Sequence, residues 1–240
     1  MSEGRQVLVL MRRLLSRPGA VAGDVVGGCE QAALRAARGL AGPDGTVTVC
    51  TVGRARREEK ALQLALKGYA NRAIRVSDSG ADRLDYLGVA RVLARVTQRA
   101  DGYQAIVCGD RSADGLSGAV GPALAELLDL PHLSGIVDLE VGDSVVASVR
   151  SNGQIHQFRV PLPAVLCIRD CSSDRLPDSA GDPNGSVETL SFRDLELGTK
   201  DLAPRTRLEG ALSALRGGTN ATMVDDARDL VLRLTEDHLL

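Results

Sequence analysis

Short apolar runs alternate with helical apolar stripes along the first half of the chain. Val7–Met11 reads Val-Leu-Val-Leu-Met, a continuous run typical of a strand buried on both faces. Leu84–Ala100 has the clearest helical spacing of apolar positions. Three further strands are expected at Thr46–Val52, Arg72–Val76 and Ala105–Cys108, and three further helices at Glu30–Leu40, Arg56–Leu66 and Gly121–Leu128. Strands alternating with helices in this way predict a doubly wound α/β fold with a mostly parallel sheet.

The pattern changes after residue 130. Strands are expected at Gly135–Glu140, Val145–Arg150, Ile155–Val160 and Ala164–Ile168. The Asn152-Gly153 dipeptide is a strong hairpin signal, so this region predicts an antiparallel extension.

The polar segment Ser172–Ser186 is rich in Pro, Gly and Asp, which indicates a linker. Thr222–Leu234 carries an apolar helical stripe suited to packing on its own domain or on another chain. We therefore expect a core at 1–171, a linker at 172–186 and a C-terminal arm at 187–240 that docks on a partner subunit.

Composition narrows the class of protein. The 240 residues are 44% hydrophobic and 25% charged, as in an ordinary globular protein. The net charge of −2 and the aromatic content of 2% argue against a nucleic-acid binder. No apolar stretch reaches the roughly 18 residues of a membrane span, and the N-terminus lacks the layout of a signal peptide. A cytoplasmic protein without a membrane span is expected.

The five cysteines also indicate a cytoplasmic protein. Their number is odd, and Cys50 and Cys108 lie at the ends of apolar runs, as expected for buried free thiols in a reducing cytoplasm. Cys167 and Cys171 are four residues apart with no second pair nearby, whereas a structural zinc site normally needs four ligands. No metal site is expected.

The segment from Gly109 to Pro122 is the most informative part of the chain for function. It follows an expected strand and leads into an expected helix, and ligands of open α/β sheets bind beyond the carboxyl ends of the strands. Its small residues would let backbone N–H groups approach a phosphate, and the helix beginning near Ser117–Gly121 adds the positive end of its dipole. Asp114 is expected either to cap the loop or to accept a hydrogen bond from a ribose or an adenine. The alternative is a glycine-rich turn that holds no ligand.

The chain lacks the standard sequence motifs that would indicate a P-loop nucleotidase, a dinucleotide-dependent dehydrogenase or a serine hydrolase. The chain has no Gly-x-x-x-x-Gly-Lys-Ser/Thr loop, no Gly-x-Gly-x-x-Gly after the first strand, and no Gly-x-Ser-x-Gly elbow. His132, His156 and His238 are scattered and are interpreted as surface or structural histidines. No catalytic residue is nominated, and a binding or carrier protein is favoured over an enzyme.

The segment Gly109–Pro131 resembles the beta subunit of electron-transfer flavoproteins. That family has Gly, then Lys or Arg, then Gln-Ala-Ile-Asp-Gly-Asp-Thr-Ala-Gln-Val-Gly-Pro, a helix, and Leu-Pro or Ile-Pro. The matching positions here are Gly109, Asp114, Gly115, Val120, Gly121, Pro122 and Leu130-Pro131. Val7–Arg13, Cys29-Glu30, Leu66–Ala73, Gly80–Asp82 and Leu162–Val165 resemble further family segments in the same order.

This resemblance implies a Rossmann-like, adenine-nucleotide-binding fold and a carrier function. Family members pair with an alpha subunit that carries the redox-active FAD, and the heterodimer shuttles electrons from a dehydrogenase to an acceptor. The beta subunit holds AMP, or a second FAD in members that bifurcate electrons, and its C-terminal segment wraps the alpha subunit. The nucleotide-binding positions implied here are Leu10, Met11, Val52, Gly53, Gly109, Asp114, Gly115, Ser117, Gly118, Ala119 and Val120.

The chain departs from the family pattern at several places. Val26-Gly27-Gly28 stands where the family has Asn-Pro-Phe, and Ala119 replaces a Gln. Each lost side-chain hydrogen bond would weaken nucleotide binding by about 0.5–1.5 kcal/mol. Ser172–Ser186 is acidic where the family has a lysine-rich loop that docks acyl-CoA dehydrogenases, so a different redox partner is expected.

Two alternatives stay open. One is a stand-alone adenine-nucleotide-binding module like the universal-stress-type proteins, for which Gly115 and Gly118 supply only part of the motif. The other is an interaction subunit that has lost its nucleotide and serves as a scaffold for the alpha chain.

Overall fold

The structure, a computed structural model, describes residues 4–12, 28–53, 55–100, 102–112, 117–142, 144–169, 185–206 and 226–236. The chain divides into two units, Met1–Thr206 and Arg207–Leu240. Among the described residues, the first unit contains a sheet and four α-helices, and the second contains one helix.

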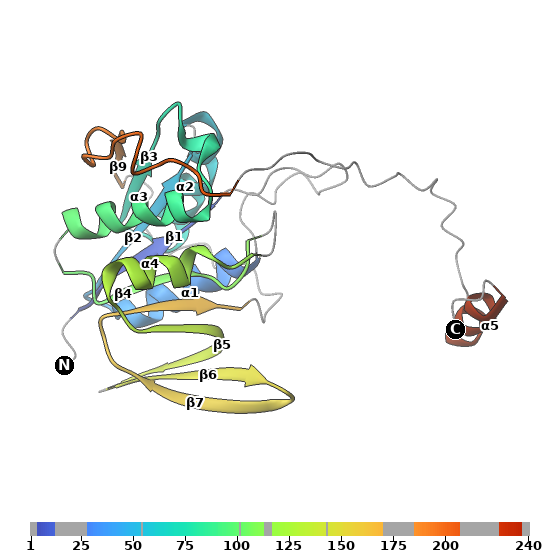
Figure 1. Cartoon of the computed structure of the whole chain (residues 1–240). Coiled ribbons are helices and arrows are strands. Elements are labelled where there is room, and N and C mark those ends of the chain that lie inside the picture. The colour runs from blue at the N-terminus through green and yellow to red at the C-terminus, as the bar shows by residue number, and fades with distance from the viewer. Residues whose placement is uncertain are drawn as a thin grey trace. The chain divides into compact units, whose positions relative to one another are not determined.

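The expected alternation of strands and helices is confirmed in the first unit (Figure 1). Its first eight main elements are β1 (Gln6–Leu10), α1 (Gly28–Ala41), β2 (Thr46–Val52), α2 (Ala55–Gly68), β3 (Arg72–Val76), α3 (Tyr86–Arg99), β4 (Ala105–Gly109) and α4 (Val120–Leu128). A short 3₁₀ turn, Ala81–Arg83, precedes α3, whose first turn is capped by the Asp85 carboxylate. This cap explains why α3 begins two residues later than the apolar pattern predicts.

The described strands form one sheet in the order β7-β6-β5-β8-β4-β1-β2-β3-β9. Strand β1 pairs in parallel with β2 on one side and with β4 on the other. The chain therefore moves outward from β1 through β2 and β3, and then returns to β4 on the opposite side. The junction of β1 and β4 is the topological switch point of the sheet, where open α/β folds bind their ligands.

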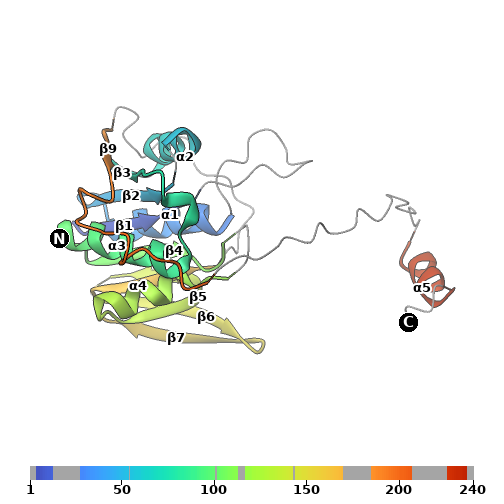
Figure 2. The ribbon, with the colours of Figure 1, turned by 45° about the horizontal axis from the view of Figure 1, so that its top comes forward.

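Helices cover both faces of the parallel part of the sheet (Figures 1 and 2). Val7 and Val9 belong to a core cluster with residues of α1 and α2, whereas Leu8 and Leu10 belong to a second cluster with residues of α3 and α4. Successive side chains of a strand point to opposite faces, so β1 is apolar from Val7 to Leu10, where helices cover both faces. The doubly wound fold predicted from the sequence is confirmed.

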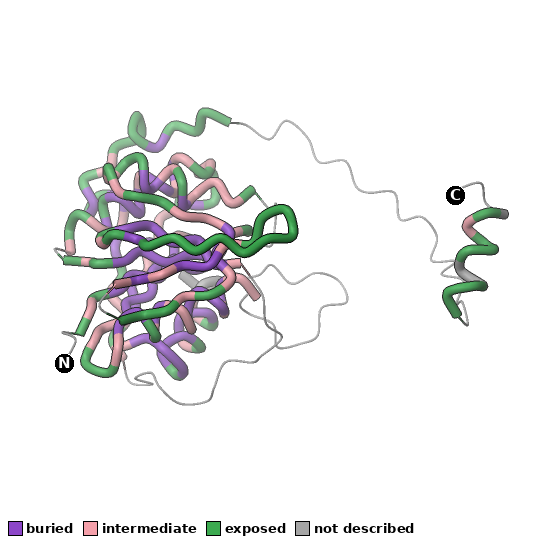
Figure 3. Tube along the Cα trace, turned by 90° about the horizontal axis from the view of Figure 1, so that it is seen from below, coloured by how far each residue is buried: buried purple, intermediate pink, exposed green. Residues whose placement is uncertain are grey.

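The antiparallel extension continues the same sheet. It consists of β5 (His132–Val141), β6 (Val145–Ser151) and β7 (Gln154–Val160), and β8 (Ala164–Ile168) joins it to β4. Asn152 and Gly153 both have positive φ angles in the hairpin turn between β6 and β7, as the Asn-Gly signal predicts. Figure 3 shows this hairpin as largely exposed, and Ile155 and Phe158 of β7 stay about half exposed.

The segment after the expected linker differs from the prediction. Strand β9 (Val187–Leu190) pairs in parallel with β3 at the edge of the sheet, and Phe192, Leu195 and Leu202 are buried against the same face as α3. Residues 187–206 therefore belong to the α/β unit, and the division of the chain falls after Thr206 rather than at 187. The expected linker lies outside the described residues, except for its last two positions.

The second unit contains α5 (Ala227–Glu236), which overlaps the predicted amphipathic stretch Thr222–Leu234 and ends two residues beyond it. Val231 and Leu232 are more than half exposed. Within the described ranges, every helix is too short or too polar to cross a bilayer.

Candidate functional site

The carboxyl ends of four parallel strands meet at the switch-point edge of the sheet. Leu10 at the end of β1 is paired in register with Cys108 of β4, and Gly109 at the end of β4 is paired with Ile168 of β8. Val52 ends β2 on the other side of β1. This edge gathers residues from distant parts of the sequence, including most of the predicted nucleotide-binding positions.

The loop after β4 folds back against the strand end. Gly118 has a φ of +57°, and a Cβ atom on it would lie 2.4 Å from the carbonyl oxygen of Asp110. Both features require glycine, because an L-residue is strained at this φ and its side chain has no space. Asp114 and Gly115, two of the predicted binding positions, lie outside the described residues.

Two helices begin at this edge. Helix α4 starts at Val120, and its N-cap residue, Ala119, has no side-chain acceptor for the N–H groups of the first turn. Helix α1 starts beside Gly109, where an added Cβ would lie 2.8 Å from the Cβ of Cys29. Helix N-termini favour anions, so both helices make the edge electropositive.

The structure brings Leu10, Met11, Val52 and Gly53 to this edge as predicted, but the side chains of Leu10 and Met11 are buried in the core. The N–H of Met11 donates to the carbonyl of Cys50, and the N–H of Gly53 donates to the carbonyl of Val76. These residues would therefore contact a ligand through their backbone and their small exposed surface, and they shape the edge mainly by ending the strands there.

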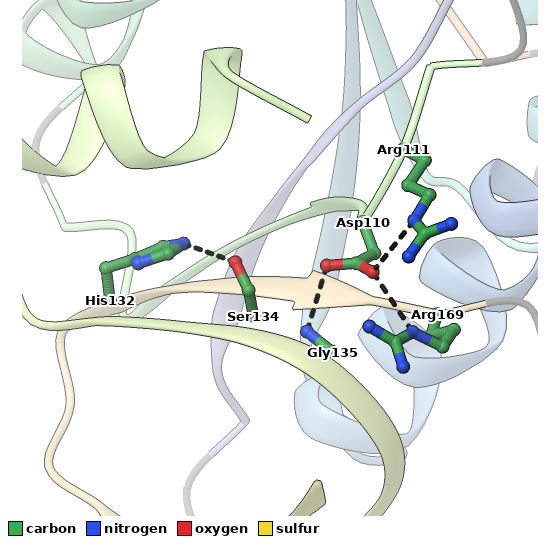
Figure 4. Close-up of polar contacts among 6 residues, drawn as sticks. All are labelled: Asp110, Arg111, His132, Ser134, Gly135 and Arg169. Carbon is green, nitrogen blue, oxygen red and sulfur yellow. Dashed lines mark hydrogen bonds and ion pairs between the residues drawn. The ribbon is translucent and has the colours of Figure 1, made fainter. Parts of the chain in front are cut away.

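A charged cluster beside the loop was missed by the sequence analysis (Figure 4). The Asp110 side chain, only 8% exposed, lies 3.2 Å from Nε of Arg169 and 3.9 Å from Nε of Arg111. Its other oxygen accepts from the N–H of Gly135 at 2.9 Å. Gly135 has a φ of +72° and lies in the irregular segment of β5, close to the Arg169 guanidinium. The carboxylate thus orients two partly exposed guanidinium groups at the strand ends.

A second cluster lies under the first turn of α4. The Cys108 and Cys167 sulfurs are 3.3 Å apart, and Cys167 Sγ lies 3.5 Å from Nε2 of His132. Ser134 Oγ lies 2.9 Å from the same nitrogen (Figure 4). The sequence analysis interpreted His132 as a surface or structural histidine, and it is exposed at one side while it contacts a buried thiol at the other.

These contacts shift the ionisation of the cluster. The hydrogen bond from Cys108, and then that from His132, lowers the pKa of Cys167 to about 6 against the cost of its burial. The same sulfur–sulfur hydrogen bond and burial raise the pKa of Cys108. The contact with Cys167 also raises the pKa of His132, although burial opposes this. A thiolate at Cys167 and an imidazolium at His132 therefore stabilise each other.

Other features do not mark a competing site. A hollow of about 410 Å³ is lined by Arg5, Ser144, Val145, Arg159, Val160, Pro161 and Leu162. It lies at the amino edge of β1, opposite the edge where the loop and both helix N-termini meet. Among the described residues, no three His, Cys, Asp or Glu side chains converge in a way that would hold a metal ion. The carboxyl edge remains the site that the chemistry supports, and it is suited to an anion held mainly by backbone.

Comparison with known proteins identifies the family of the chain. The family model described as "Electron transfer flavoprotein domain" matches residues 25–195, more than half of the chain. The chain belongs to the electron transfer flavoprotein family, as the Gly109–Pro131 segment implied.

Relatives that match the chain include beta subunits of this family. The chain is 30% identical over 142 residues to the electron transfer flavoprotein subunit beta of Mycobacterium tuberculosis, a match that covers 58% of this chain and 53% of that protein. It is 28% identical to the Bacillus subtilis subunit over 68% of this chain and 65% of the relative. It is 27% identical to the subunit beta of Thermoanaerobacterium thermosaccharolyticum, and this match covers 82% of this chain and 80% of the relative. In the mycobacterial match the chain therefore spans about half of the relative's length.

Proposed function

We propose that this chain is the beta-type subunit of an electron carrier, and that its switch-point edge holds an adenine nucleotide, either AMP or FAD. In this proposal the chain binds rather than catalyses. It pairs with an alpha-type subunit that carries the redox-active FAD, and the pair moves electrons from a dehydrogenase to an acceptor. The flavin supplies the redox chemistry, and the chain supplies position and electrostatics.

The observation that carries the proposal is the return of the Gly118 loop against the Asp110 carbonyl, directly before the first turn of α4, whose N-cap residue is Ala119. This return places the backbone of Gly118–Val120 beside the end of β4, and Ala119, at the N-cap position of α4, offers no side-chain acceptor to the N–H groups of the first turn. A phosphate fits such a loop because N–H groups and a helix dipole bind anions without requiring a particular side chain.

The residues at the edge fit the rest of a nucleotide. Arg111 is 55% exposed and Arg169 39% exposed, so both guanidinium groups reach solvent beside the loop while Asp110 holds them. Their charge would stabilise a phosphate that carries more than one negative charge. The adenosine would extend past Gly109 toward the ends of β1 and β2, at Met11 and Gly53. This arrangement does not use the Asn and Gln side chains that the chain lacks.

Pairing with an alpha-type subunit is supported by the second unit. Helix α5 exposes Val231 and Leu232 in an amphipathic stretch, as a helix that docks in a groove on another chain would. The acidic segment Ser172–Ser186 supports a redox partner different from an acyl-CoA dehydrogenase.

The test is AMP binding by the purified chain, measured by calorimetric titration. The double variant Ser117→Asp with Gly118→Asp places two carboxylates in the loop and is expected to abolish binding by repelling the phosphate. A matched control, Gly153→Asp with Gln154→Asp, adds the same charge at an exposed hairpin that also has a positive-φ glycine.

Binding that is lost in the loop variant and kept in the hairpin variant supports the assignment. Equal binding by both variants would remove the nucleotide from this loop. Failure of the wild-type chain to bind AMP or FAD, alone or with an alpha subunit, would favour a scaffold subunit without nucleotide.

A further inference from the structure

Two cysteines from strands far apart in the sequence face each other beneath α4. Cys108 of β4 and Cys167 of β8 are register partners in adjacent parallel strands, and their sulfurs are 3.3 Å apart. Neighbouring strands lie about 4.7–4.9 Å apart, which is within the Cα spacing of about 4.4–6.8 Å that a disulfide bridges. Both thiols are free in this structure, and their register and separation are compatible with a disulfide.

A base and a hydrogen-bonding hydroxyl stand next to one member of the pair. His132 Nε2 lies 3.5 Å from Cys167 Sγ, and Ser134 Oγ lies 2.9 Å from the same nitrogen. His132 is exposed, whereas Cys167 is 1% and Cys108 7% exposed. The histidine thus connects a buried sulfur with solvent, and it is placed to exchange the proton of that sulfur.

We propose that Cys108 and Cys167 form a peroxide-sensitive dithiol site, in which Cys167 is the reacting thiolate, His132 is its proton donor and Cys108 is the resolving thiol. The site is separate from the electron transfer of the proposed function. The low exposure of both sulfurs restricts the oxidant to a small hydroperoxide.

The chemistry balances in two steps. The Cys167 thiolate attacks the terminal oxygen of the hydroperoxide, an S–O bond forms, the O–O bond breaks, and the leaving alkoxide takes a proton from the His132 imidazolium. Cys167 has lost two electrons and is a sulfenic acid, and the hydroperoxide has become an alcohol, or water when the oxidant is hydrogen peroxide. The Cys108 sulfur then attacks Cys167, an S–S bond forms, the S–O bond breaks, and the hydroxide leaves as water with the Cys108 proton.

The two sulfurs have different roles because their surroundings differ. Cys167 receives hydrogen bonds from Cys108 and His132, which lower its pKa and keep it a thiolate at neutral pH. The hydrogen bond with Cys167 and then burial raise the pKa of Cys108, and the negative charges of Asp110 and Glu30 add to this effect. Cys50 is buried with no such donor, and burial raises its pKa to about 12, so it serves as an internal control.

The site lies against the start of α4. An added Cβ at Gly121 would lie 2.5 Å from Cys167 Sγ and 3.1 Å from Cys108 Sγ, so the helix backbone rests on both sulfurs. Formation of the bond moves both sulfurs and changes the packing under the first turn of α4. Oxidation is therefore expected to alter the amide protection of this turn, a readout independent of any nucleotide.

The experiment treats the full-length chain with hydrogen peroxide, blocks the remaining thiols and maps tryptic peptides by mass spectrometry. Cleavage after arginine places Cys108 on the peptide 100–111 and Cys167 on 160–169, and neither peptide contains another cysteine. The expected product joins these two peptides with the loss of two hydrogen atoms, and dithiothreitol separates them. The Cys50→Ala variant is expected to give the same product.

Variants assign the roles. Cys108→Ser is expected to leave a sulfenic acid on 160–169 that dimedone labels, whereas Cys167→Ser is expected to leave Cys108 reduced. His132→Gln is expected to slow formation of the bond by about tenfold at neutral pH, because the sulfur loses a donor and the alkoxide loses its proton source. If the wild-type peptides 100–111 and 160–169 stay reduced while peroxide oxidises Cys29, the proposal is overturned; that measurement requires no variant to fold.

Discussion

Replacing Gly118 with alanine tests the geometry of the loop directly. At a φ of +57° an L-residue costs about 1–2 kcal/mol. The new Cβ would also lie 2.4 Å from the Asp110 carbonyl oxygen, so the two atoms must separate by about 1 Å to reach ordinary van der Waals contact. Such overpacking typically costs a further 1–3 kcal/mol, roughly.

Gly42 provides the matched control. It also has a positive φ, of +74°, but no atom lies within 4 Å of an added Cβ. Gly42→Ala therefore isolates the backbone cost of about 1–2 kcal/mol. We expect Gly118→Ala to lower the free energy of unfolding by about 1–3 kcal/mol more than Gly42→Ala, or about 2–10 °C in melting temperature.

Urea unfolding followed by circular dichroism measures this difference, and calorimetry on the folded variants measures AMP binding. Gly118→Ala is expected to bind AMP at least about tenfold more weakly than Gly42→Ala, since the shifted loop no longer aims its N–H groups. Equal stability of the two variants would refute the close approach of the loop to Asp110. Equal AMP binding would refute the role of the loop as a phosphate cradle.

Three further changes test other parts of the account. Asp85→Ala removes the α3 cap and the acceptor for the N–H groups of Arg205 and Thr206, so urea unfolding should show a loss of about 1 kcal/mol or more. Burial opposes ionisation of Asp85, but hydrogen bonds from Gly88, Thr206 and Arg205 lower its pKa. The difference in unfolding free energy between the wild type and Asp85→Ala should therefore persist at neutral pH and vanish as the pH falls through that lowered pKa. Asp110→Asn keeps an acceptor for Gly135 but removes the negative charge beside the Arg111 and Arg169 guanidinium groups, so AMP affinity should change with a steeper salt dependence, and an unchanged salt dependence would argue against their role. Truncation after Thr206 should leave the melting temperature of the α/β unit within about a few degrees of that of the full chain. The same truncation should weaken co-purification with an alpha subunit.

Local apolar patterns predicted the fold well because they reflect burial. The continuous run Val7–Met11 indicated a strand covered on both faces, and two core clusters on opposite faces confirm this. Strand β9 was not predicted, since Val-Glu-Thr-Leu is short, half-polar and set in a polar tail. Its pairing with β3 depends on tertiary contacts that a local pattern does not contain.

The site was predicted only in part, for a similar reason. The glycine-rich loop is contiguous, so its position at the end of β4 could be inferred from the sequence. The contacts of Asp110 with Arg169, and of Cys108 with Cys167 and His132, join strands that become neighbours only through the order β5-β8-β4. A predicted strand order would have been the signal, because Cys108 and Cys167 hold similar positions near the ends of their strands.

In the proposed function, this chain holds an adenine nucleotide of its own beside the FAD of an alpha-type subunit. The most direct measurement is to purify the chain with its alpha-type partner, denature the complex, and quantify released FAD and AMP per heterodimer by chromatography. The proposed function predicts one FAD with one AMP, or two FAD. One FAD with no AMP would contradict it and leave the chain as an interaction subunit without a nucleotide.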